Sequence, residues 1–293
     1  MKGETFKNLL AAVGAVFLAL IVLSFLIAYL AGKGPIVGED KVAVVSLEGL
    51  ITDPMDFTAE LREYEERDDV KAVVVRINSP GGAVGPSQEI YSAIKRLKKK
   101  KKVVASMGAI AASGGFYAAM AADRVVANPG TITGSIGVIV EFMNAEELLS
   151  KIGLQGHVVK SGKFKDTGSP LRKMTPEERT LIQEVIDDVN GQFIGAVAEG
   201  RGLKEEDVRK IADGRIFSGA QAAKQGLVDS LGDLADAVDL SAELAGIKGK
   251  PYVIYPERKM LGLWSAVFGE SVTNLAGAFS GFRIMYMTPN PAK

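Results

Sequence analysis

Short apolar runs alternate with amphipathic stretches along the first half of the chain, and this pattern predicts strands that alternate with helices. Three apolar runs have the length of strands: residues 42–47, 72–77 and 103–106. The second run is rich in valine and has no polar side chain before Arg76. A strand without a polar face is typical of a parallel sheet that is covered on both sides. Residues 55–67 and 86–97 have the spacing of surface helices.

The alternation continues to about residue 127, and the remainder of the chain is more helical. The next expected elements are a helix over residues 114–122, a strand over 124–127 and a strand over 138–140. Strands and helices in alternation indicate an α/β fold with a mainly parallel sheet. Thr175 followed by Pro176 is a typical helix start, and that helix extends towards Glu199. Three shorter helices are expected over residues 204–212, 219–225 and 231–244.

Residues 9–31 form an uncharged and mostly apolar run near the N-terminus. At about 1.5 Å of rise per residue, a helix of this length can cross a hydrocarbon core of about 30 Å. A cleaved signal peptide is the alternative, but its apolar region is usually only about 7–15 residues long. Lys2 and Lys7 precede the run, and this favours a cytoplasmic N-terminus. We therefore expect a single-pass anchor in the cell membrane, with the folded domain on the extracytoplasmic side.

This anchor divides the chain into five predicted parts. They are a cytoplasmic N-terminus (1–8), the transmembrane anchor in contact with lipid (9–31), a linker (32–40), a folded domain (41–256) and a C-terminal tail (257–293). The tail is rich in glycine, phenylalanine and methionine, and its residues 282–287 are strand-like.

The composition restricts the kinds of partner and site. The chain carries 35 basic and 35 acidic residues, and a balanced charge argues against nucleic acid as the main partner. With one histidine and no cysteine, it has almost nothing from which to build serine–histidine, cysteine–histidine or zinc sites. A serine activated by a neutral lysine needs neither residue type. Residues 95–102 are strongly basic, either as the solvated end of a helix or as a contact for anionic lipid headgroups.

Two serines are candidates for a nucleophile. Ser135 lies in Gly-Ser-Ile-Gly, which is one residue out of the G-x-S-x-G elbow pattern and precedes a strand-like run. Ser113 fits better because it lies between a predicted strand and a predicted helix. Gly114 follows it, and the N–H of Gly114 can stabilise an oxyanion. An ordinary helix-capping serine is the alternative for Ser113.

A nucleophile of this kind also needs a second oxyanion donor and a base. The sequence Ser-Pro-Gly-Gly after the strand over residues 72–77 can direct the N–H of Gly82 into the crevice where α/β proteins bind ligands. An ordinary turn is the alternative. Lys160, Lys163 and Lys165 share one loop, and the catalytic lysine must be neutral, which burial achieves by lowering its pKa. Spacing alone does not separate the three lysines.

Five segments carry a resemblance to a known family: residues 78–82, 107–116, 128–138, 160–175 and 211–222. In their order and spacing they resemble the short form of the signal peptide peptidase A family. The resemblance implies a fold of the Clp protease/crotonase superfamily, which is built from repeated ββα-type units. By position in the motifs, it implies that Ser113 is the nucleophile and Lys165 the general base. Ser135 is similar to a residue that orients this lysine, and Gly82 and Gly114 form the expected oxyanion hole.

The same resemblance implies a membrane-bound serine endopeptidase that degrades signal peptides after their release from precursors. It implies a ring-shaped homo-oligomer and extended apolar substrates bound by strand addition, and we expect neither a cofactor nor a metal. The strand-like tail is similar to such a substrate and is expected to lie in a peptide groove or to pack as an extra strand. The rival interpretations are a crotonase-type acyl-CoA enzyme, a catalytically silent scaffold and a related protease that acts on other membrane-protein segments.

Overall fold

The computed structural model describes residues 14–23, 40–256 and 285–287. The chain divides into two compact units, Met1–Glu39 and Asp40–Lys293. In the first unit, residues 14–23 form a helix whose side chains are exposed. No helix within the described ranges is both long enough and apolar enough to cross a membrane. Much of the predicted anchor, nearly all of the linker and most of the tail lie outside the described residues.

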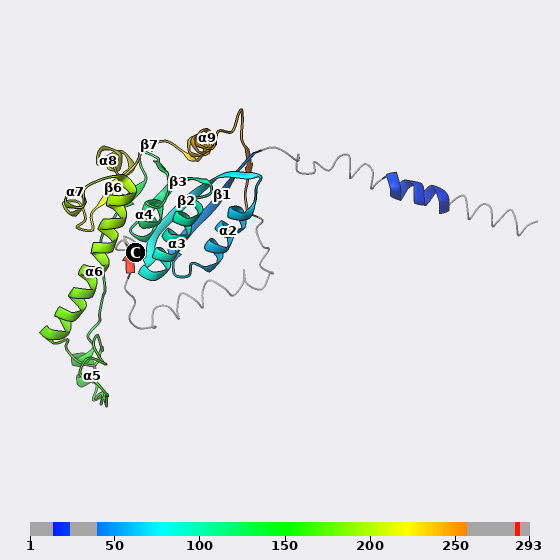
Figure 1. Ribbon diagram of the computed structural model, residues 1–293. Coiled ribbons are helices and arrows are strands. Elements are labelled where there is room, and N and C mark those ends of the chain that lie inside the picture. The colour runs from blue at the N-terminus through cyan, green and yellow to red at the C-terminus, as the bar shows by residue number, and fades with distance from the viewer. Residues whose placement is uncertain (1–13, 24–39, 257–284, 288–293) are drawn as a thin grey trace, which may run out of the picture. The chain divides into compact units, whose positions relative to one another are not determined.

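A mixed sheet organises the second unit (Figure 1). Its strands are β1 (Lys41–Ile51), β2 (Val70–Ala83), β3 (Lys102–Ala112), β4 (Arg124–Ala127), β5 (Ile132–Gly134), β6 (Ile216–Ser218), β7 (Ser230–Leu231), β8 (Tyr252–Ile254) and β9 (Met285–Met287). The central order β5–β3–β2–β1–β8 is parallel throughout; β4 also pairs in parallel with β3, and β7 pairs in parallel with β4. β6 and β9 pair antiparallel with β5 and β2. The predicted α/β class is confirmed, with a sheet that is parallel at its centre.

Helices cover both faces of this sheet. They are α2 (Met55–Glu66), α3 (Val84–Leu97), α4 (Gly114–Ala119), α5 (Glu146–Lys151), α6 (Pro176–Arg201), α7 (Glu205–Arg209), α8 (Gly219–Lys224) and α9 (Leu234–Leu244). Alternate residues of β2 belong to two separate apolar clusters. Val73 and Val75 lie in the cluster of α2, α3 and α4, whereas Ala72 and Val74 lie in the cluster of α9. The valine run therefore has no polar face because neither of its faces meets water.

The central strands β2 and β3 extend beyond the ranges that the sequence predicts for them, residues 72–77 and 103–106. β2 continues through residues 79–82, where Gly82 pairs with Ile51 of β1 and Ser79 pairs with Ala111 of β3. The expected turn is therefore wrong: tertiary pairing extends this segment despite its proline and glycines. The strand expected over residues 138–140 is also wrong, because only residue 139 makes a bridge there.

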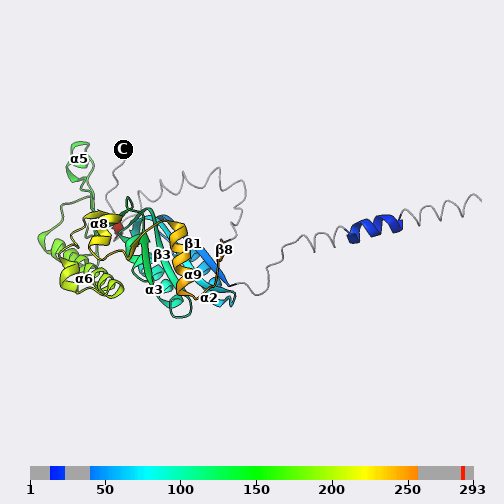
Figure 2. The same cartoon turned by 90° about the horizontal axis from the view of Figure 1, so that it is seen from above.

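The long helix α6 connects the domain to a projecting arm. It begins as predicted, with a capping box in which the Glu178 N–H donates to Thr175 Oγ1 (3.2 Å) and the Thr175 N–H donates to Glu178 Oε2 (2.8 Å). In its C-terminal half, the ring of Phe193 lies 6.5 Å from that of Phe116 and 5.0 Å from that of Tyr117, both in α4. The N-terminal end of α6 and the helix α5 extend away from the sheet (Figures 1 and 2).

The basic run of residues 95–102 is partly engaged with the domain's own surface. Lys95 and Lys100 form ion pairs with glutamates, and Lys101 donates to two backbone carbonyl oxygens. These contacts favour the first interpretation of the run, the charged end of a helix.

Candidate active site

Ser113 lies where β3 ends and α4 begins, with backbone angles of φ 51° and ψ −117°. A positive φ is uncommon for serine, and a strained serine on a strand-to-helix turn is typical of a nucleophile. The residue is 0 % exposed. It occupies the N-cap position of α4 but makes no capping bond, and its Oγ has no hydrogen-bond partner among the described residues. Helix capping therefore does not explain this serine.

The two predicted oxyanion donors, Gly82 and Gly114, lie in adjacent backbone segments beside Ser113. Gly114 is the first residue of α4, so its N–H has no acceptor within the helix. A methyl carbon built on Gly114 would lie 3.3 Å from the Gly82 nitrogen. At Gly82, a methyl carbon would lie 2.1 Å from the carbonyl oxygen of Ile51. The close approach of β1 therefore requires glycine at position 82, and the Gly82 backbone leaves little room for a side chain at position 114.

Ser135 lies next to Ser113, at the end of the neighbouring strand. β5 runs parallel to β3 with Gly134 opposite Ala112, and the Ser113 N–H donates to the Gly134 carbonyl oxygen (2.8 Å). Ser135 is 4 % exposed and has a φ of 52°, so it is a second buried serine with strained backbone. The structure thus brings Ser113 and Ser135 together, and the role of Ser135 stays a prediction.

Lys165 is not brought to these serines within the single chain. It is exposed in the loop before α6, and no hydrogen bond joins it to Ser113 in the part of the chain that the structure describes. The expected burial of this lysine is therefore wrong for one chain on its own. Lys160 forms an ion pair with Asp166, and Lys163 forms one with Glu177. Each of these two amines is thus held by a carboxylate, whereas no ion pair holds Lys165 within the described residues, and this leaves Lys165 as the better candidate.

Two other ionisable groups have pKa values that bear on the choice of base. Burial raises the pKa of Tyr117 to about 12, so its phenol stays protonated near neutral pH. Burial lowers the pKa of Lys101, as a lysine base requires. However, Lys101 precedes β3 and Ser113 follows it, and at about 3.3 Å per residue this 11-residue strand holds them about 36 Å apart. Lys101 is therefore too distant to serve Ser113.

A cluster of three charged residues, Asp166, Arg172 and Glu178, holds the loop that carries Lys165. Arg172 Nε donates to Asp166 Oδ2 (2.9 Å), and Arg172 Nη1 donates to Glu178 Oε2 (2.9 Å). Glu178 is 2 % exposed and also accepts a hydrogen bond from the Thr167 hydroxyl (3.2 Å). Hydrogen bonds from the guanidinium lower the pKa of Glu178 to about 2 and hold that of Asp166 well below its usual range. No role for this cluster follows from the sequence, because two of its members lie in a loop and the third in a helix, so no single period relates them.

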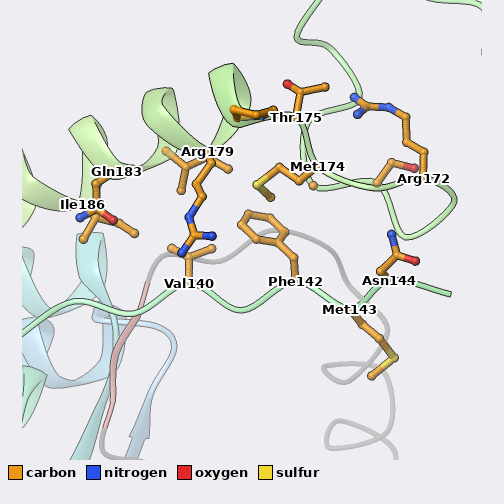
Figure 3. A pocket seen from close by; sticks show the side chains of 14 residues that line it. Val140, Phe142, Met143, Asn144, Arg172, Met174, Thr175, Arg179, Gln183 and Ile186 are labelled. Carbon is orange, nitrogen blue, oxygen red and sulfur yellow. The ribbon is translucent and has the colours of Figure 1, made fainter. Parts of the chain in front are cut away.

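An apolar pocket of about 600 Å³ adjoins the same loop (Figure 3). It lies between residues 140–144 and the first half of α6, and its lining includes Phe142, Met174 and Ile186. Arg172 is also part of this lining. The charged cluster and the pocket therefore share one side chain.

The carboxyl end of β2 also carries a strand from the C-terminal region. β9 pairs antiparallel with it, with Tyr286 opposite Gly82 and Met285 opposite Ala83. The strand-like segment expected at residues 282–287 is thus a strand over Met285–Met287. It adds to β2 at Gly82, one of the two oxyanion candidates, and this is the geometry of strand addition by a peptide.

Together, the fold and the site define a class of enzyme. A strained, buried serine at the end of a parallel strand, beside closely packed glycine backbone, is typical of a serine hydrolase with a backbone oxyanion hole. The sequence profile of peptidase family S49 matches residues 95–248, and that of Clp protease matches residues 41–131. The chain belongs to peptidase family S49 and is a serine protease with a Clp protease-like fold.

Similar proteins agree with this assignment. A provisionally named protease from Synechocystis sp. is 52 % identical over 187 residues, which cover 64 % of this chain and 67 % of the relative. A protein of Enterococcus faecium, provisionally named signal peptide peptidase SppA, is 36 % identical over 213 residues, or 68 % of this chain and 62 % of its own. Serine protease SPPA, chloroplastic, from Arabidopsis thaliana is 32 % identical over 224 residues, or 72 % and 33 %. The resemblance drawn from the sequence motifs is confirmed.

Proposed function

We propose that this protein is a membrane-anchored endopeptidase that degrades signal peptides after their release from precursors, with Ser113 as nucleophile and Lys165 as base. The observation that carries the proposal is the buried Ser113 Oγ, which has no hydrogen-bond partner among the described residues. The relative named for signal peptide peptidase supports the substrate class. The apolar run of residues 9–31 supports an anchor in the cell membrane with a cytoplasmic N-terminus.

In the proposed mechanism, neutral Lys165 accepts the proton of Ser113 Oγ as this oxygen attacks the scissile carbonyl carbon. The N–H groups of Gly82 and Gly114 donate to the resulting oxyanion, and the loss of one such donor costs about 10²–10³ in rate. Lys165 then passes the proton to the leaving amine, and an acyl-enzyme remains on Ser113. Water, deprotonated by Lys165, releases the second peptide and restores the serine. Ser135 orients the lysine amine through its hydroxyl.

We propose further that Lys165 of one copy serves Ser113 of the next copy in a homo-oligomer. The exposed position of Lys165, on a loop at the projecting end of α6, supports this arrangement. Mixing inactive Ser113→Ala and Lys165→Ala chains tests it. Random assembly pairs an intact serine with an intact lysine at about one site in four, so about a quarter of the wild-type activity should return. A mixture that stays inactive after subunit exchange contradicts a dyad shared between copies.

Two features support extended apolar substrates. β9 pairs with β2 at Gly82 and Ala83, where a substrate strand would place its scissile bond beside Ser113. The apolar pocket beside the lysine loop suits apolar side chains of a bound peptide.

The decisive experiment is digestion of a synthetic signal peptide by the full chain in detergent micelles. Mass spectrometry of the products should show internal cleavage within the apolar segment, and the Ser113→Ala chain should produce none. An unchanged peptide after incubation with folded, oligomeric wild-type protein would contradict the proposed substrate.

A further inference from the structure

We infer that Arg172, together with Asp166 and Glu178, is a positioning residue that fixes Lys165 for proton transfer, an inference that rests on the proposed role of Lys165. The lysine side chain itself has no ion-pair partner within the described ranges. Its position is therefore set by the backbone of its loop, and the residue that follows it, Asp166, is the part of that loop which the cluster holds.

Arg172 donates hydrogen bonds to three atoms of Asp166. Its Nε donates to Oδ2 (2.9 Å), and its Nη2 donates to Oδ1 (2.8 Å) and to the backbone carbonyl oxygen of Asp166 (3.3 Å). A two-pronged guanidinium–carboxylate contact fixes orientation as well as distance, and lysine cannot reproduce it. The additional bond to the backbone restrains the peptide unit between Asp166 and Thr167, one residue beyond Lys165.

The terminal nitrogens of the Arg172 guanidinium are fixed to the first turn of α6. Both terminal nitrogens of its guanidinium donate to Glu178, which is buried at the first turn of α6. Further along α6, Phe193 packs against Phe116 and Tyr117 of α4, the helix that Ser113 precedes. A continuous series of contacts therefore connects the loop of the base, through α6, to the core of its own domain.

The cluster also removes a competing contact for Lys165. A free carboxylate on the adjacent Asp166 could pair with the lysine amine and hold it away from a serine. Asp166 is instead occupied by Arg172 and by Lys160, and its side chain is 12 % exposed. Removal of Arg172 should therefore misplace the base. Because Arg172 also lines the apolar pocket, Asp166→Asn, which leaves that lining intact, tests the position of the base alone.

The test compares full-length Arg172→Ala, Arg172→Lys and Asp166→Asn with wild type, by kcat and KM on a fluorogenic apolar peptide. Misplacement of the base by about 1 Å should lower kcat on the order of 10–100-fold in all three. KM should stay nearly unchanged in Asp166→Asn, because Asp166 lies outside the lining of the pocket. Guanidinium ion, at concentrations that leave the protein folded, should restore part of the kcat of Arg172→Ala. Glu177→Gln is the matched control, because Glu177 pairs with Lys163 on the same loop and lies outside the cluster; its kcat should stay near wild type.

The outcomes separate this inference from the proposed function. If Lys165→Ala is inactive while folded Arg172→Ala and Asp166→Asn keep wild-type kcat, the positioning role is wrong and the dyad stands. If Lys165→Ala itself stays active, the proposed base is wrong. A loss of kcat that accompanies loss of the oligomer, and that guanidinium does not reverse, would show that the cluster is only structural and would overturn the inference. Should Arg172→Ala fail to assemble, Asp166→Asn decides by the same criteria.

Discussion

Replacement of Gly114 by alanine should damage the proposed oxyanion hole more than it damages the fold. The added methyl carbon would lie 2.4 Å from Ser87 Oγ and 3.3 Å from both the Gly82 nitrogen and the Gly81 Cα. The first contact is too short to persist, so Ser87 must rotate and lose its hydrogen bond to the Ala83 carbonyl oxygen (2.8 Å). The contact with Gly82 is tight but tolerable, and it places a methyl group beside a nitrogen that is proposed to bind the oxyanion.

These contacts give two different magnitudes. Overpacking typically costs about 1–3 kcal/mol, and alanine returns up to about 1 kcal/mol because it is a better helix former than glycine. The expected net loss of stability is therefore about 1–2 kcal/mol, and each kcal/mol lowers Tm by about 2–4 °C in a domain of this size. Loss of one oxyanion donor would lower kcat about 10²–10³-fold, or roughly 2.7–4 kcal/mol of transition-state stabilisation.

The double variant Gly114→Ala/Ser87→Ala separates packing from catalysis. Removal of the Ser87 hydroxyl relieves the shortest contact, so Tm should recover towards that of Ser87→Ala alone. The value of kcat should stay low, because the methyl group still lies against Gly82. Calorimetry and peptide turnover on the three variants measure both quantities. A kcat within about fivefold of wild type in Gly114→Ala, or a kcat that recovers together with Tm in the double variant, would refute the reasoning.

Four further outcomes are expected. Ser113→Ala and Lys165→Ala should each abolish peptide cleavage with unchanged circular dichroism, because nucleophile and base act as one unit; near-normal turnover in either folded variant contradicts this. The wild-type rate should rise with pH, because a lysine must lose a proton before it can act as a base; a rate that is flat from about pH 5 to pH 9 counts against Lys165. The Tm difference between wild type and Arg172→Ala should be constant above about pH 4.5 and should decrease as the pH falls towards 2. The contact with Arg172 lowers the pKa of Glu178 from 4.5 to about 2, so ionised Glu178 stabilises the folded protein and protonated Glu178 does not. An equal Tm difference at acid and neutral pH contradicts this. Ending the chain after Tyr255 should lower KM for a short apolar peptide, because β9 no longer occupies the end of β2; an unchanged KM in an unchanged oligomer makes the tail a structural appendage.

The elements that the sequence predicted are those set by local pattern. The valine run of β2 predicted a strand buried on both faces, and Thr175 with Pro176 predicted the start of α6. The short strands β5 and β6 have three residues each, which is too few to show a period, and their conformation depends on pairing with strands remote in sequence. The extension of β2 through its proline and glycines has the same cause.

In the candidate site, too, some residues are set by a local pattern and others by contacts that form only in the folded chain. Ser113, Gly82 and Gly114 could be predicted because each lies in a short motif at the end of a strand. Local pattern does not choose among the three lysines, and Lys165 is predicted only from the family resemblance, because the contacts of each amine depend on how the loop folds. Asp166 and Glu177 take up Lys160 and Lys163 by contacts that no local period specifies.

The packing of α6 has a mechanical consequence. Phe193 fixes the helix on α4, and the lysine loop is attached to it at Glu178. The helix spans about 22 Å between these two residues, at about 1.5 Å per residue. A tilt of about 3° at the phenylalanine would move the loop by roughly 1 Å, a displacement that can cost an enzyme about 100-fold in rate. Phe193 is thus the pivot of this helix, and the position of the Lys165 amine depends on how an aromatic ring packs in the core.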